Sequence, residues 1–87
     1  MRKMMQPIEM VCWSDANGKL SPIRFRVENS DQELFVIRID KVLDRREERV
    51  SGQRTQHFLC RSIVQDVARQ YEVAYELASC KWYLSKW

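Results

Sequence analysis

The 87-residue sequence contains little of what usually interrupts or cross-links a chain: two glycines, two prolines, three cysteines and one histidine. Cys12, Cys60 and Cys80 form no closely spaced pair, which excludes a disulfide framework or a zinc knuckle of ordinary spacing. We expect all three to be small buried hydrophobic residues. With His57 as the only histidine and two distant glycines, we find no catalytic constellation, metal site or phosphate-binding loop. The sequence therefore predicts a protein that is not an enzyme and that uses no cofactor.

Long apolar runs and clustered charge are also missing. No run approaches the ~20 residues that span a bilayer, and Gln6, Pro7 and Glu9 interrupt the apolar segment that a signal peptide would need after its basic start. The composition, 45% hydrophobic and 31% charged, is that of a folded soluble protein. The net charge of +3 is spread along the chain, whereas nucleic-acid binders usually show a basic stripe. We therefore expect one cytoplasmic domain over residues 1–87 without membrane contact.

Alternation of apolar and polar residues with a period of two is the dominant pattern and predicts strands. Asn17-Gly18 predicts a tight type I′ turn, and the polar residues 29–33 predict the next turn. The first half of the stretch 34–43 is apolar on both faces, as in a central strand. The six predicted strands are residues 8–13, 22–28, 34–43, 57–64, 71–77 and 81–87.

Residues 63–78 fit two structures. Apolar residues recur at spacings of three and four, as in a helix, but a turn at Gln65-Asp66 followed by alternating Tyr71, Val73 and Tyr75 fits a strand. Tyrosine and valine prefer sheets, and every other segment reads as a strand. We therefore favour the turn and strand and keep a helix near 63–78 as the alternative.

Short connections between six strands predict an antiparallel meander. An open sheet without helices would expose one apolar face, so we predict an all-β fold in which the sheet curls into a small barrel or half-barrel. A helix near 63–78 would make the fold α+β instead. The C-terminal segment 81–87 is expected to close the sheet as its last strand. The predicted inward residues are Ile8 or Val11, Phe25, Val27, Ile37, Ile39, Phe58, Cys60, Tyr71, Val73, Leu77, Trp82 and Leu84.

Three segments, IEMVCWSDANGKLSPIRFRVE, IRIDKVL and YEVAYELASCKWYL, together resemble a set of short proteins of unknown function from Gram-positive bacteria, over nearly the whole chain. The tripeptide Trp82-Tyr83-Leu84 is also similar to the signature of the WYL domains, small Sm- or SH3-like β-barrels of bacterial transcription regulators. This second resemblance implies a ligand-sensing barrel. In that family ligand-contacting arginines follow the tripeptide, and the present sequence has no residues after Trp87 that match them.

Protein binding is the function that the remaining features favour, through an edge strand or through exposed side chains. The charged segment 44–54 is predicted to be solvated, either as a ribbon turning at Ser51-Gly52 or as a short helical turn. Aromatic residues expected on the face opposite the core would add a partner or dimer interface. The candidate contacts are Arg45, Arg46, Arg49, Arg54, Trp13, Tyr83 and Trp87.

Single-stranded nucleic-acid binding is the alternative. Arg24, Arg26, Arg38 and Arg61 can share one outer face and hold phosphates, while aromatic residues stack on bases. Four acidic residues share that face by the same alternation, which argues against this function. The sequence thus predicts a non-catalytic module that binds another protein or self-associates, with nucleic-acid binding or ligand sensing as alternatives.

Overall fold

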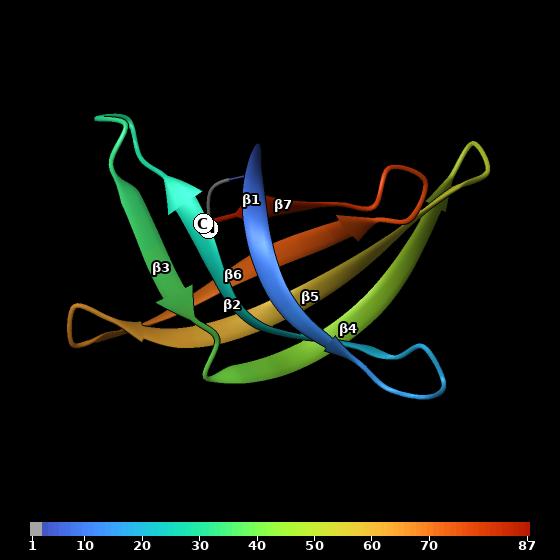
Figure 1. Cartoon of the computed structure of the whole chain (residues 1–87), viewed down its shortest axis with the longest axis horizontal. Coiled ribbons are helices and arrows are strands. Elements are labelled where there is room, and N and C mark those ends of the chain that lie inside the picture. The colour runs from blue at the N-terminus through green and yellow to red at the C-terminus, as the bar shows by residue number, and fades with distance from the viewer. Residues whose placement is uncertain (1–2) are drawn as a thin grey trace.

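The computed structural model describes residues 3–87 as seven antiparallel strands in one sheet (Figure 1). Their order across the sheet is β3-β2-β1-β7-β6-β5-β4. The all-β class is therefore confirmed, and residues 63–78 form a turn between two strands. The strands are β1 (Lys3–Ser14), β2 (Leu20–Glu28), β3 (Leu34–Arg38), β4 (Lys41–Val50), β5 (Gln53–Val64), β6 (Val67–Glu76) and β7 (Lys81–Lys86).

The predicted number of six strands is wrong because the stretch 34–43 forms two strands. The amide of Ile39 donates to the carbonyl of Ile23 in β2 (2.9 Å), whereas the next amide, Asp40, donates to the carbonyl of Arg61 in β5 (3.0 Å). The chain thus leaves one edge of the sheet at Ile39 and joins the opposite edge at Asp40. The apolar positions 35, 37 and 39 are followed in phase by Lys41, and the next apolar residue is Val42, so the alternation changes phase at this point.

The sheet is strongly bent but not closed, so of the predicted forms, a barrel or a half-barrel, the closed barrel does not form (Figure 1). Its two edge strands, β3 and β4, are consecutive in the chain. The edges converge where β3 ends, since the Ser62 hydroxyl of β5 donates to the carbonyl of Arg38 (2.6 Å). Ser62 is fully buried and also shares a 2.5 Å hydrogen bond with the Tyr71 hydroxyl. The two edges therefore approach each other at one end of the sheet, where residues 38–41 contact β5.

The core fills the inner side of the bent sheet. Aromatic rings pack across it, with the Phe25 and Tyr71 centroids 5.6 Å apart and those of Phe58 and Trp82 5.5 Å apart. Between the two candidates on β1, Ile8 packs against the core while Val11 is 46% exposed. The predicted inward residues that are buried are Phe25, Ile37, Phe58, Cys60, Tyr71, Val73, Trp82 and Leu84.

Two tight turns are where the sequence predicts them. Both Ser51-Gly52 and Gln65-Asp66 have positive φ at their two positions, as a type I′ turn requires. The segment 44–54 is accordingly a hairpin ribbon. Asn17-Gly18 differs, because only Gly18 has a positive φ (81°) and the Asp15 carboxylate accepts from the Asn17 and Lys19 amides (2.9 and 2.8 Å). This connection is a longer Asp-capped loop, not a type I′ turn.

The cysteines are not all buried, contrary to the prediction. Cys60 is buried in the core, and burial raises the pKa of its thiol to about 12. Cys12 and Cys80 are exposed. Cys12 adjoins an irregularity in the pairing of β1 with β2, and Cys80 lies in the β6–β7 turn with a positive φ of 59°. The prediction depended on how often free cysteine is buried in proteins, and a turn or an irregular strand position is an exception to that tendency.

Candidate functional site

Strand β3 forms one edge of the sheet and pairs only with β2 among the described strands. In this ladder the amide of Ile39 donates to Ile23 and the amide of Asn29 donates to Glu33, so the hydrogen-bonded pairs fall at odd positions of β3. Antiparallel geometry then directs the N–H and C=O groups of Leu34, Val36 and Arg38 away from β2. The Arg38 carbonyl accepts from Ser62. The backbone groups of Leu34 and Val36 face the open side of the sheet.

The side chains of this edge are apolar and exposed. Leu34 is 57% exposed, Phe35 43% and Val36 66%. The prediction that this stretch is a central strand covered on both faces is therefore wrong. The stretch is apolar, as a central strand would be, but β3 has a neighbouring strand on one side only. An exposed apolar edge of this kind is a template for pairing with another chain.

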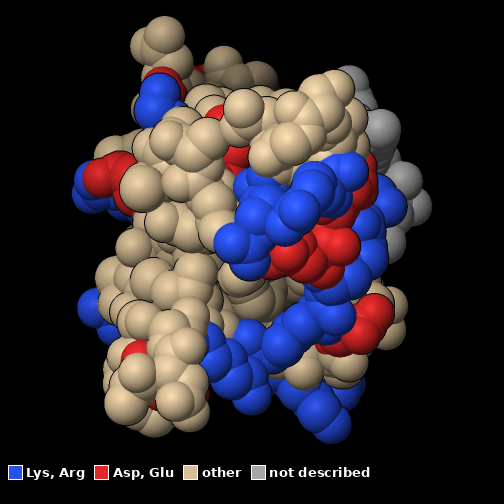
Figure 2. All heavy atoms as spheres, turned by 90° about the vertical axis from the view of Figure 1, so that its right-hand side faces the viewer, with Lys and Arg blue, Asp and Glu red and all other residues tan. Residues whose placement is uncertain are grey.

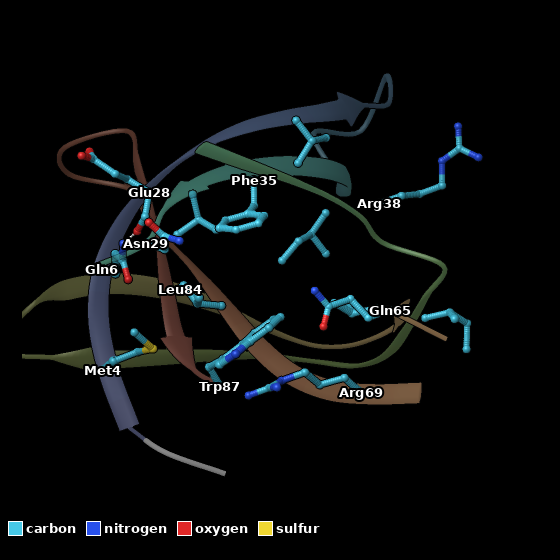
Figure 3. Close-up of a pocket in the computed structure, with 15 residues that line it drawn as sticks. Met4, Gln6, Glu28, Asn29, Phe35, Arg38, Gln65, Arg69, Leu84 and Trp87 are labelled. Carbon is cyan, nitrogen blue, oxygen red and sulfur yellow. Dashed lines mark hydrogen bonds between the residues drawn. The ribbon is translucent and has the colours of Figure 1, made fainter. Parts of the chain in front are cut away.

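A cleft of about 640 Å³ lies between β3 and the β5–β6 turn (Figure 3). Phe35 and Trp87 point into it from opposite sides, whereas Arg38 points away (Figure 3). Apolar groups provide most of its surface. Its apolar lining residues are Met4, Val27, Phe35, Val36, Ile37, Ile63, Val64, Leu84 and Trp87, and its polar ones are Gln6, Glu28, Asn29, Arg38, Gln65 and Arg69.

The other wall of the cleft is the end of β5. Strand β4 begins its pairing at Lys41, opposite Arg61, so residues 62–64 of β5 extend past it. The Ile63 amide donates to the Asp40 carboxylate (2.8 Å), and the Ile63 side chain is exposed. The cleft is thus bordered by two strand segments, residues 34–36 and 62–64, that lack a neighbour on the sides facing it. This is the space that one more strand would occupy.

Two arginines lie together on the outer face beside this edge. Arg24 of β2 is directly opposite Arg38 of β3, and because the flanking pairs are hydrogen-bonded, this is the closer, non-hydrogen-bonded type of pair. Like charges opposite each other are unfavourable. Among the described side chains no carboxylate lies within ion-pair distance of either arginine. On β1, the residue opposite Arg24 is Val11.

A second polar cluster surrounds Glu72 on the outer face. The Glu72 residue is only 6% exposed, and its carboxylate lies 2.8 Å from Nδ1 of His57, 3.2 Å from Arg46 and 3.6 Å from Lys86. Ser85 donates to it as well (3.3 Å). Burial alone would raise the pKa of the Glu72 carboxyl, but the His57 hydrogen bond and the two cations together outweigh burial and hold that pKa below its ordinary value of 4.5.

The contacts of Glu72 define its role. Both carboxylate oxygens are engaged, and the four partners come from β4, β5 and β7. Ser85 donates to the Glu72 backbone carbonyl (3.1 Å) as well as to its side chain, so the residue is held through both its backbone and its carboxylate. We therefore regard the cluster as a link between strands. Glu72 thus lies on the outer face of the sheet but is covered by side chains of its neighbouring strands.

Three of the four arginines predicted for partner contact have partners within the chain. Arg46 binds Glu72, and Arg54 binds Glu47 (2.7 Å). Arg45 of β4 donates to the carbonyl of Leu20 and to the Ser21 hydroxyl, both in β2. The Arg45 guanidinium also lies 5.4 Å from the centre of the Phe58 ring. For Arg49 the structure gives no side-chain hydrogen bond or ion pair among the described residues.

The three aromatic residues predicted for the outer face do not lie together. Trp13 is 64% exposed near the end of β1, while Tyr83 is opposite Pro7, six residues or roughly 20 Å away along β1. Trp87 points inward, which corrects the prediction. A bulge in β7 at Ser85 shifts the alternation by one residue, so the Trp87 ring lies 5.2 Å from that of Tyr71.

The four arginines predicted for nucleic-acid contact do not form one cluster. Arg26 forms an ion pair with Glu9 (2.7 Å), Arg24 and Arg38 form the pair described above, and Arg61 lies on β5 opposite Lys41. On the side toward which the β4–β5 turn points, positive and negative side chains lie against each other (Figure 2). That side therefore presents charge of both signs.

Comparison with models of known protein families, with curated proteins and with solved structures finds no match for this chain. Over residues 3–87, no group of histidine, cysteine and acidic side chains is arranged to hold a metal ion, and no helix has the length and apolar character to cross a membrane. The candidate site is thus defined by its geometry: an apolar edge strand, paired with β2 on one side only, beside a cleft.

Proposed function

We propose that this protein is a non-catalytic interaction module that binds an extended segment of another protein as an additional strand on β3. The observation that carries the proposal is the edge formed by Leu34, Phe35 and Val36, which is apolar, exposed and unpaired on its outer side. Strand addition to a sheet edge is a common mode of peptide recognition, in which backbone hydrogen bonds give affinity and pockets for alternate side chains give specificity.

The adjoining cleft supplies such a pocket. Side chains of an added strand alternate between the two faces of the sheet, so every second residue of the partner would enter the cleft between Phe35 and Trp87. The volume of about 640 Å³ lies within the range usual for binding pockets. The partner would replace exposed apolar surface by contact on both walls and would narrow the opening of the sheet.

A proline scan of the edge tests this proposal. The Val36 amide faces outward, so Val36→Pro removes a donor for the partner without removing a β2–β3 hydrogen bond. The matched control is Arg49→Pro on the other edge strand, where the residue next to the hairpin pair Val50–Gln53 also directs its amide outward. Extended peptides selected from a random display library against the wild-type protein provide the probe.

We expect Val36→Pro to weaken the selected peptides by at least about tenfold, because a backbone hydrogen bond contributes on the order of 1 kcal/mol and the pyrrolidine ring also blocks close approach. Arg49→Pro should bind them as the wild type does. Circular dichroism checks that both variants fold. Selection of no peptide, or equal affinity for Val36→Pro and the wild type, would contradict strand addition at β3.

We also propose the cytoplasm as the location of the protein. All three cysteines are free, which supports a reducing compartment.

A further inference from the structure

We infer that the strand bound at β3 alternates apolar and acidic residues, with the acidic side chains on the outer face against Arg24 and Arg38. This inference rests on the proposed function and specifies the chemistry of its partner. The two faces of the site differ in the way that such a partner requires. The inner face is the mainly apolar cleft. The outer face carries the Arg24–Arg38 pair at the C-terminal end of β3, whereas the exposed Glu28 lies opposite Leu34 at its N-terminal end, so the acidic residue of the partner that we expect is the one beside Arg38.

The arginine pair is the like-charged pair that lies beside the open edge. Arg26, Arg46 and Arg54 have carboxylate partners, whereas Lys41 and Arg61 form another like-charged pair where β4 meets β5. Arg24 and Arg38 face each other directly and have no described carboxylate within ion-pair distance. A carboxylate placed beside them would relieve their repulsion and gain two charge-assisted contacts.

The position of the pair connects it to the open edge. Arg38 belongs to β3 itself, so a strand added to β3 would have its outward side chains next to those of Leu34, Val36 and Arg38. Directly opposite and diagonal neighbours on adjacent strands are within reach of a side chain as long as arginine. Arg38 points away from the cleft (Figure 3), which places its guanidinium on the face where those outward side chains would lie.

Residues of the partner that point inward meet a different surface. Phe35 and Trp87 lie on the walls of the cleft, and the Arg69 guanidinium lies over the Trp87 ring at 3.9 Å from its centre. This stacking leaves the in-plane N–H groups of Arg69 free, so Arg69 is a cation in the lining of an otherwise mainly apolar cleft. An inward acidic residue would have to enter a mainly apolar cleft, whereas valine, isoleucine or leucine would bury apolar surface there.

Charge disfavours a second copy of this chain as the occupant. Antiparallel pairing of two β3 strands around Val36 would set Leu34 of one copy beside Arg38 of the other, so that one Arg24–Arg38 pair would lie at each end of the junction. The strand LFVIR contains no acidic residue to neutralise them. The net charge of +3 on each chain adds to this repulsion. A segment of a different, acidic protein fits the edge better.

Three synthetic peptides test the inference against the full-length protein. Each carries valine at alternate positions, with glutamate, glutamine or lysine between them, and binding is followed by fluorescence anisotropy at low and high salt. We expect the glutamate peptide to bind at least about tenfold more tightly than the glutamine peptide at low salt, and the lysine peptide to bind most weakly. The preference for glutamate should shrink as salt is raised.

Variants assign the preference to the arginine pair. The double variant Arg24→Gln, Arg38→Gln should bind the glutamate and glutamine peptides equally, whereas the control Arg26→Gln should keep the preference. Both changes are on the surface, and the double change removes a repulsion, so thermal melting should show that the fold is intact. Equal affinity of the wild type for glutamate and glutamine peptides, with binding still lost in Val36→Pro, would overturn the acidic partner and leave the proposed function standing.

Three other outcomes also decide against the inference. Binding of no peptide in a Val36-dependent way, including library peptides, would remove the proposed function itself. Binding of single-stranded oligonucleotides that depends on Arg24 and Arg38 but not on Val36 would assign the pair to nucleic acid. Concentration-dependent self-association in sedimentation, lost in Val36→Pro, would make a second copy the occupant.

Discussion

The two edge strands of the sheet, β3 and β4, follow one another in the chain but present opposite surfaces. Strand β3 has the sequence LFVIR, and its first three residues are apolar and exposed. Strand β4 has the sequence KVLDRREERV, whose second half is a dense run of both charges. An edge with charged side chains discourages pairing with other chains, whereas an apolar edge invites it. The chain thus protects one edge and leaves the other available.

The two edges are also fastened to the rest of the fold differently. Strand β4 is held by polar side chains, with Arg45 reaching the β2 backbone and Arg46 binding Glu72. Strand β3 is held at its C-terminal end by one buried hydroxyl, that of Ser62. Its N-terminal part has ladder contacts with β2 alone. Strand β3 can therefore accept a neighbour without first losing a contact, and we regard this as the physical basis of the proposed function.

The largest loss of stability is expected for a substitution in the core, which supports both edge strands. Trp82 of β7 packs against Phe58 of β5 and Tyr75 of β6, with ring centroids 5.5 and 4.9 Å apart. We expect Trp82→Ala to destabilise the protein by about 3–5 kcal/mol, the range for removal of a buried large aromatic side chain. Urea denaturation would measure the loss. Hydrogen exchange should then show β3 and β4 losing protection together, and a loss confined to one edge would mean that the two do not share this core.

The sequence was sufficient to predict the strands and most of the core. Residues such as Phe25 and Tyr71 alternate with polar neighbours, and this alternation predicts burial because a half-buried strand places every second side chain inside. The strand reading of residues 63–78 is confirmed for the same reason, since Tyr71, Val73 and Tyr75 line the inner side or its border.

What the sequence did not predict depends on contacts between distant segments. The change from β3 to β4 at Asp40 is set by a hydrogen bond to Arg61, and the inward position of Trp87 by a bulge at Ser85. Alternation cannot show that Glu72 is covered by side chains from three other strands. The cleft was missed because it exists only where the two edges diverge. Three consecutive apolar residues, 34–36, were the one local signal for the edge, and they resemble a central strand equally well.

The next largest loss of stability is expected for Glu72, whose carboxylate binds Arg46 of β4 and has no counterpart at β3 among the described residues. Glu72→Gln should destabilise the protein by about 1–3 kcal/mol at neutral pH, since hydrogen bonds to a buried charged group are lost. The folded-state pKa of Glu72 lies below 4.5, so the unfolded chain binds more protons as the pH falls below that value. The stability that Glu72 contributes is therefore present above this pH and is lost in acid.

Denaturation with urea at a series of pH values checks this prediction. The wild type should lose part of its stability below the ordinary pKa of a glutamate, and Glu72→Gln should show a shallower decline. The control is Glu76→Gln on the same face of β6, whose side chain bonds to Ser79 in the turn and should matter less. An unchanged pH profile in Glu72→Gln would indicate that the β4 side does not depend on this carboxylate.

The smallest effect lies within β4 and distinguishes a tethered arginine from a solvated one. Arg45 contacts Leu20, Ser21 and the Phe58 ring, so Arg45→Ala should cost about 1 kcal/mol through lost hydrogen bonds and cation–π contact. Arg49→Ala should change stability by less than about 0.5 kcal/mol, as is usual at solvated positions. The sequence alone predicted the same negligible effect for both arginines. Equal midpoints of urea denaturation for the two variants would support that simpler expectation, and β4 would then be a charged edge without a tether to β2.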